Sequence, residues 1–140
     1  MFFRPACFPV RSRLRAAAEA HDDPREALLS VFGVQAATFA RPGYRGCAFN
    51  RASAEAQPGT AAYEVPRAYR RWLRGFLADL SAAAGAPEPD VLARQIHLLY
   101  DGAMTAASLD GDADVTAASR AAAGALLDAA LAGAAPSSKA

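Results

Sequence analysis

The sequence predicts an all-α protein, a bundle of several helices joined by short loops. Large apolar side chains recur at steps of three and four residues, the spacing that places them on one face of a helix. Proline and glycine fall mainly between these segments, where they end helices. Alanine, the strongest helix former, supplies much of the 53% hydrophobic content, and strand formers are scarce throughout. The 140 residues are the size of one ordinary domain.

Two helices are expected in the first third of the chain. Residues 11–20 are basic and rich in alanine, which favours a short helix. Asp23-Pro24 then supplies a carboxylate cap and a proline at the first helical position, and Glu26, three residues after the cap, resembles a capping box. The helix that begins there carries its larger side chains on one stripe and stops at Pro42-Gly43; the stripe comprises Leu28, Val31, Phe32, Gln35 and Phe39.

The middle of the chain predicts a short helix and a long one. Residues 47–56 form the short helix, which Pro58-Gly59 ends. The long helix has Val65, Tyr69, Trp72, Phe76 and Leu80 on one side, and arginines 67, 70, 71 and 74 on the other. Because an interior proline removes a backbone hydrogen bond, Pro66 must lie in the first turn or kink the helix. We interpret the arginine side as solvated, since the aromatic rings lie opposite it and not among the charges.

Two further helices are expected before the C-terminus. Pro89 and Asp90 suit a first turn, and the apolar pattern continues from there to Leu109. His97, Asp101, Thr105 and Ser108 form one narrow polar stripe on this helix. The last helix spans residues 113–132, with one face formed by Val115, Ala118, Ala122, Leu126 and Ala129.

Charge and cysteine usage exclude several classes of function. A net charge of +1 gives no excess of basic residues to attract nucleic acid, so we expect no direct DNA binding by this chain alone. Cys7 and Cys47 are too few and too far apart for a disulfide framework or a zinc site, so no metal and no cofactor are expected. Two prolines and an arginine interrupt the apolar N-terminus before a signal-peptide core develops. We expect no apolar stretch of the sequence to be long enough to span a bilayer. A cytoplasmic location follows from these expectations.

Two readings of the side chains that could carry chemistry stay open. Cys47 and His97 are conceivable as a nucleophile and its base, but no third orienting residue or glycine-rich oxyanion element accompanies them, so we expect no enzyme. The aromatic residues, which are spread over four helices, form either plain core or the wall of a ligand cavity. Asn50, His97 and Tyr100 favour the cavity, because ligand sites are apolar chambers with a few polar fixing points.

Three segments resemble a known family. They are Asp22-Asp23-Pro24-Arg25-Glu26, then residues 39–52 with Gly46-Cys47-Ala48-Phe49 as the most specific part, and then Leu98-Leu99-Tyr100-Asp101-Gly102-Ala103. Their sequences, order and separation resemble the regulatory half of TetR-family transcriptional repressors, over residues 11–132.

The resemblance implies five or six helices around an effector cavity, with the last two helices of each subunit forming a four-helix dimer interface. It divides the chain into an irregular tail (1–10), a ligand-binding and dimerisation domain (11–133) and a flexible C-terminal tail (134–140). The expected ligand-binding residues are Phe49, Asn50, Tyr69, Trp72, Phe76, His97, Tyr100 and Met104. The expected interface residues of the homodimer are Leu98, Ala106, Leu109, Ala117, Ala121, Gly124, Leu127 and Asp128.

One departure from the family concerns DNA. Family members begin with a three-helix DNA-binding headpiece, and residues 1–10 do not resemble it. The sequence therefore predicts the regulatory domain of a TetR-like repressor that senses a small apolar molecule and has no headpiece of its own. The alternatives are a small helical enzyme that uses Cys47 or His97, and a stand-alone dimerisation partner that antagonises full-length relatives.

Overall fold

The computed structural model describes residues 7–44, 46 and 54–134, and this part of the chain forms a bundle of helices without strands. The all-α prediction is confirmed. The helices are α1 (Cys7–Glu19), α2 (Pro24–Phe39), α4 (Ala61–Ala83), α5 (Pro89–Leu109) and α6 (Val115–Ala134).

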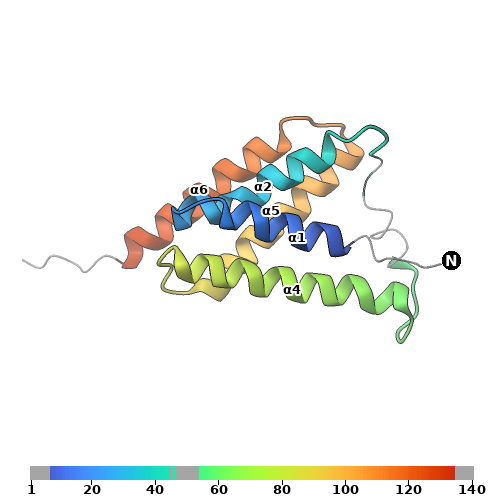
Figure 1. Ribbon diagram of the computed structural model, residues 1–140, viewed down its shortest axis with the longest axis horizontal. Helices are drawn as coiled ribbons and strands as arrows, with labels where there is room; N and C mark the ends of the chain where they lie inside the picture. Colours follow the sequence, from blue (N-terminus) through green and yellow to red (C-terminus); the bar gives the residue numbers. More distant parts are fainter. Residues whose placement is uncertain (1–6, 45, 47–53, 135–140) are drawn as a thin grey trace, which may run out of the picture.

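Helix α2 lies at the centre of the bundle, because it contacts each of the other four helices. In Figure 1, α1 and α4 run side by side along one side of the molecule, and α6 lies beside α2 on the other. The core is built from fully buried apolar side chains of all five helices: Leu14, Leu28, Phe32, Leu73, Leu77, Ile96 and Leu127.

The start of α2 follows the sequence prediction at the cap. Asp23 has an extended backbone, and its carboxylate accepts a hydrogen bond of 3.0 Å from the backbone N–H of Arg25. The second half of the expected capping box is not present. The carboxylate of Glu26 instead accepts hydrogen bonds from the guanidinium groups of Arg25 and Arg120. Because Arg120 belongs to α6, Glu26 joins two helices rather than capping its own.

Two helices begin earlier than the sequence suggested. Helix α1 starts at Cys7 and not at Arg11, so part of the expected irregular tail is helical. Pro9 is tolerated there, because first-turn N–H groups have no helical partner to lose. Helix α4 starts at Ala61, which puts Pro66 inside the helix instead of in its first turn. The helix predicted over residues 47–56 falls mostly outside the described residues.

Gly46 connects the segment after α2 to α5. It has a positive φ of 84°, a conformation that favours glycine. A Cβ atom on this residue would lie 2.6 Å from Oγ of Ser108, far inside van der Waals contact. A side chain at this position would therefore require both a strained backbone and a shift of Ser108.

Helix α6 corrects the expectation that no stretch could span a bilayer. Its 20 residues are long and apolar enough to cross a membrane, by length and composition only. In the structure one face of α6 packs into the bundle, and its buried residues include Thr116, Ser119 and Leu127. Two charged side chains of α6 are also paired with α2, Arg120 with Glu26 and Asp128 with Arg25. These contacts are those of a helix in a bundle.

Candidate ligand cavity

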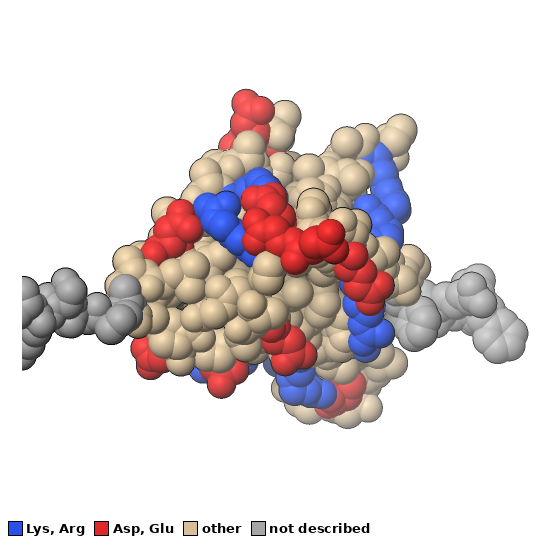
Figure 2. Space-filling view, turned by 60° about the vertical axis from the view of Figure 1, so that its left-hand side comes forward, with Lys and Arg blue, Asp and Glu red and all other residues tan. Residues whose placement is uncertain are grey.

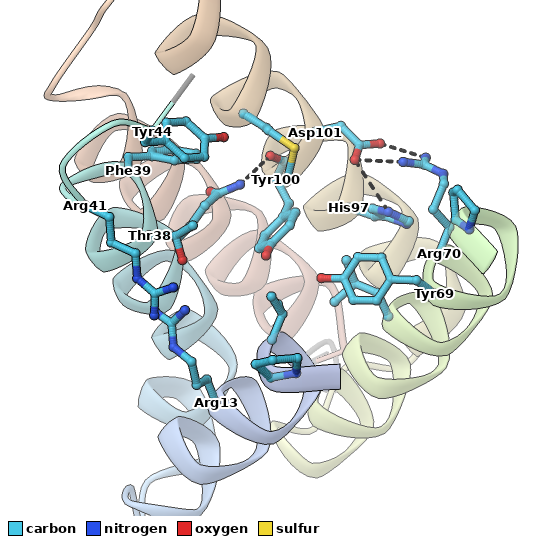
Figure 3. Close-up of a pocket in the computed structure, with 16 residues that line it drawn as sticks. Arg13, Thr38, Phe39, Arg41, Tyr44, Tyr69, Arg70, His97, Tyr100 and Asp101 are labelled. Atoms are coloured by element: carbon cyan, nitrogen blue, oxygen red, sulfur yellow. Dashed lines mark hydrogen bonds and ion pairs between the residues drawn. The ribbon is translucent and has the colours of Figure 1, made fainter. Parts of the chain in front are cut away.

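A cavity of about 400 Å³ lies between α1, α2, α4 and α5 (Figure 3). Apolar side chains line it from all four sides, and a few polar groups reach into it. The first half of the chain contributes Pro9, Val10, Arg13, Gln35, Thr38, Phe39, Arg41 and Tyr44, and the second half contributes Pro66, Tyr69, Arg70, Leu73, His97, Tyr100, Asp101 and Met104.

Helical spacing explains which side chains of α5 reach the cavity. His97, Asp101 and Met104 follow one another at steps of four and three residues, so they lie on one face of the helix. Tyr100 lies beside them and is 3% exposed. The other two members of the expected polar stripe are used locally, because the hydroxyls of Thr105 and Ser108 donate to carbonyls one turn earlier in α5.

Gln35 brings an unsatisfied polar atom to the cavity wall. Its side-chain Nε2 donates a hydrogen bond of 2.7 Å to the backbone carbonyl of Tyr100, which connects α2 to α5. Its Oε1 is buried and accepts no hydrogen bond. A buried acceptor without a donor costs about 1–3 kcal/mol, so a donor that enters the cavity would recover stability.

His97 supplies a second unsatisfied atom. The residue is 3% exposed, and its Nε2 has no hydrogen-bond partner. The Oδ1 atom of Asp101 lies 3.7 Å away, too far for a hydrogen bond. Burial lowers the pKa of His97, as do the charges of Arg70 and Arg74, while the carboxylate of Asp101 opposes the shift. The imidazole is therefore neutral at pH 7 and can donate or accept one hydrogen bond.

Asp101 is occupied by Arg70. Two hydrogen bonds of 2.8 and 2.7 Å join the guanidinium of Arg70 on α4 to both carboxylate oxygens of Asp101 on α5 (Figure 3). This bidentate pair closes one side of the cavity and neutralises both charges. Tyr100 also remains uncharged at pH 7, because burial raises the pKa of its phenol.

The structure brings together half of the expected ligand-binding residues. Tyr69, His97, Tyr100 and Met104 all line the cavity. Phe49 and Asn50 lie outside the described residues.

Trp72 and Phe76 are placed elsewhere, which corrects the expectation that they share this cavity. Their rings stack on each other at a centroid distance of 5.1 Å. The guanidinium groups of Arg11 and Arg15 from α1 lie 5.1 and 5.4 Å from the Trp72 ring. Around α4, Trp72 is displaced by roughly 60° from Tyr69, on the side away from the cavity. Phe76 lies about two turns beyond Tyr69 along the helix. Tyr69 connects the two regions, since it lines the cavity and also stacks on Trp72 at 6.0 Å.

The expected interface residues divide into two groups. Leu98 and Leu109 are exposed by 66% and 79%, and Ala117 and Ala121 are also exposed, whereas Ala106 is half-buried. Gly124 and Leu127 are buried within the subunit, so they are unavailable to a second copy. Asp128 forms an ion pair with Arg25 on α2. Gly124 and Leu127 thus lie on the side of α6 that packs into the subunit, whereas Asp128, whose side chain is 60% exposed, stays a predicted interface residue.

Sequence reasoning missed most of the side chains from the first half of the chain that line the cavity. Gln35 gave a signal, since it is the one polar residue on an otherwise apolar stripe of α2. Phe39 belongs to the same stripe and to the aromatic set considered for a cavity wall. The remaining residues gave no local signal: Pro9, Val10, Arg13, Thr38, Arg41 and Tyr44.

The described residues contain no group of three or more His, Cys, Asp or Glu side chains that could hold a metal ion. Cys47, the suggested nucleophile, lies outside the described residues.

Comparison with known proteins gives a structural match. No protein-family model and no curated protein matches the sequence. Among solved structures, a TetR-family transcriptional regulator from Streptomyces coelicolor matches with a TM-score of 0.81 and 26% sequence identity, over 89% of this chain and 67% of that one. The chain therefore has the fold of a TetR-family transcriptional regulator, as the sequence resemblance predicted.

Proposed function

We propose that the described helices form the effector-binding and dimerising part of a TetR-like transcriptional repressor. The observation that carries the proposal is the cavity, in which two buried polar atoms, Oε1 of Gln35 and Nε2 of His97, lack partners inside an apolar wall. A volume of about 400 Å³ falls within the roughly 300–1,000 Å³ of small-molecule sites. The effector is a small, largely apolar molecule with at least one hydrogen-bonding group.

The exposed surface of α5 supports dimerisation. The large hydrophobic residues that stand out as exposed on the described surface are Val91, Leu98 and Leu109, and all belong to this helix. Val91 and Leu98 are seven residues apart, and Leu109 follows after eleven more, so the three lie along one stripe. An exposed apolar stripe of this kind marks an interaction site.

The outer face of α6 has the composition of a close helix contact. Its exposed residues are almost all small, comprising Ala117, Ala118, Ala121, Ala122, Ala125, Ala129 and Ala132. Only 28% of the most apolar 18-residue window of this helix is buried within the subunit. We propose that this alanine face and the apolar stripe of α5 pair with the same surfaces of a second copy, in an isologous homodimer.

Helix α5 is shared by the cavity and the proposed interface. His97, Tyr100 and Met104 face the cavity, whereas Leu98 and Leu109 face outward. A ligand that favours one position of α5 would therefore favour one arrangement of the dimer, which is the coupling that an allosteric repressor needs.

Direct DNA reading is not part of the proposed role of these helices. On the face in Figure 2, basic and acidic side chains lie beside one another, so their charges largely cancel there. The net charge of the whole chain is +1. We propose that the 140-residue polypeptide alone does not bind specific DNA, and a salt-resistant, sequence-dependent gel shift with this polypeptide would contradict that.

A fluorescence titration tests ligand binding. N-phenyl-1-naphthylamine, a neutral apolar probe, should bind saturably at one site per subunit. Replacing Met104 by tryptophan should narrow the cavity and weaken binding, whereas the volume-conserving control Met104→Leu should retain it. Probe binding that is unchanged in Met104→Trp would place the ligand outside this cavity. No saturable binding of this probe or of a panel of other apolar molecules would overturn the proposal.

A further inference from the structure

Two arginines meet at one end of the cavity. Arg13 comes from α1, and Arg41 follows the C-terminus of α2; both line the cavity. Figure 3 shows their side chains extending toward one another at this end of the cavity. Arg13 donates a hydrogen bond of 3.4 Å to the carbonyl of Val34, which also accepts from Thr38. Because a carbonyl group has no net charge, this hydrogen bond leaves the positive charge of Arg13 without a counter-charge.

Neither arginine has a carboxylate partner within the described residues. The ion pairs there involve Arg25, Arg70 and Arg120 as the basic members. Asp101, the acid that lines the cavity, already accepts both of its short hydrogen bonds from Arg70.

The rest of the chain cannot supply a side-chain carboxylate either. All fourteen aspartates and glutamates of the sequence lie within the described ranges. The charged side chains of the remaining residues are Arg4, Arg45, Arg51 and Lys139, which are all basic. Two neighbouring guanidinium groups repel each other unless an anion lies between them, so this end of the cavity is suited to an anion from outside the chain.

The charge at this end acts on the interior of the cavity. Burial is the main influence on the pKa of Tyr100 and raises it, whereas the positive charge of Arg13 acts in the opposite direction. The phenol of Tyr100 and the guanidinium of Arg13 line the same cavity. Between the arginines and the Arg70–Asp101 pair, the wall is formed by apolar side chains that include Val10, Phe39 and Leu73.

We infer that the cavity binds an amphipathic anion, a carboxylate or phosphate group on an apolar body, with the anionic oxygens between Arg13 and Arg41. The inference rests on the proposed effector-binding function and names the chemical class of the effector. Each guanidinium can donate two parallel hydrogen bonds to an oxyanion. The apolar body extends toward Leu73, and Gln35 and His97 offer neutral hydrogen bonds to a polar atom on it.

Calorimetric titration with three molecules of one chain length tests the inference. Octanoate and octyl phosphate carry the two kinds of anionic head, and 1-octanol is the neutral reference. At low salt, at least one anion should bind roughly ten- to a hundredfold more tightly than 1-octanol, as expected for one or two charge-assisted hydrogen bonds. The stronger of the two anions identifies the head group.

Charge-removing variants show whether the two arginines are responsible. Arg13→Gln and Arg41→Gln should each reduce the preference for the anion, and the double variant should bring the affinities for anion and alcohol together. The control is Arg71→Gln, which removes the same charge from an exposed position on α4 outside the cavity and should leave the preference intact. Circular dichroism checks that each variant remains folded.

The outcomes separate this inference from the proposed function. If 1-octanol binds in the cavity as tightly as both anions, effector binding stands and the anionic class is overturned. A preference for the anion that persists in the double variant would also overturn the assignment to these arginines. If none of the three molecules binds and the apolar panel fails as well, both the inference and the proposed function are overturned.

Discussion

Truncating two exposed leucines of α5 should weaken the proposed homodimer by an amount that follows from their exposure. Burying a whole leucine side chain is worth about 1.5–3 kcal/mol. Leu98 and Leu109 are 66% and 79% exposed in one subunit, so most of that gain is still available to a partner. Since alanine keeps part of the apolar surface, each truncation should cost about 1 kcal/mol per side chain. Symmetry doubles the cost, because each residue occurs twice in a homodimer.

The expected dimer dissociation constants can be measured by analytical ultracentrifugation over a range of concentrations. Leu98→Ala should raise the constant roughly thirtyfold, corresponding to about 2 kcal/mol, and Leu98→Ala with Leu109→Ala should raise it roughly a thousandfold. Val65→Ala on α4 is the control, since it truncates an apolar side chain on a different helix. A wild-type protein that sediments with the 14.6 kDa mass of one subunit at micromolar concentration would refute the reasoning, as would equal effects of the α4 and α5 variants.

Three further predictions concern the subunit itself. Leu127→Ala should lower the free energy of unfolding by about 2–5 kcal/mol in urea, because Leu127 is fully buried against the core, and a loss below 0.5 kcal/mol would contradict its placement. The pKa of His97 in the folded state lies below its unfolded value near 6.5, so the unfolded chain binds the proton more readily and the folded state should lose stability as the pH drops through about 6.5. His97→Gln should lose less stability than the wild type between about pH 7.5 and 5.5. Identical pH profiles of the two proteins would count against a buried neutral imidazole. Asp128→Ala breaks the exposed ion pair with Arg25 and should cause only a small loss of stability that disappears at high salt; a large, salt-independent loss would show that the pair is not the solvated contact described here.

The order of the helices could be predicted from the sequence because the signals are local. Asp23 and Pro24 mark the start of α2, and Pro89 marks that of α5. The apolar stripe from Leu28 to Gln35 also faces the core as expected. Caps, prolines and helical periodicity each act within a few residues, so they can be interpreted without knowing the tertiary structure.

The faces of α6 could not be assigned in this way. Small apolar residues surround this helix on all sides, so hydrophobic pattern alone does not distinguish the face that meets α2 from the face left exposed. In the structure the face with Gly124 and Leu127 packs into the bundle, where Gly124 lies against Arg25 and Leu29 of α2.

The cavity was only partly predictable for a similar reason. Tyr69 and Trp72 belong to one aromatic stripe in the sequence, but α4 packs between two neighbours and divides that stripe between the cavity and α1. Arg13 and Arg41 come from separate segments, and nothing in their local sequences indicates that they meet. Such placements depend on how the helices pack.

The most direct test of a ligand-responsive dimer is the dimer dissociation constant measured with and without a saturating cavity ligand. Sedimentation equilibrium with N-phenyl-1-naphthylamine or octanoate, whichever binds more tightly, gives both values. Since α5 carries both the cavity residues and the exposed leucines, the ligand should change the constant by about fivefold or more, within the usual range of allosteric coupling. At the same ligand concentration, the change should be smaller in Met104→Trp, which narrows the cavity. If the dissociation constant is the same with the cavity empty and with it saturated, the cavity and the dimer interface are not coupled through α5.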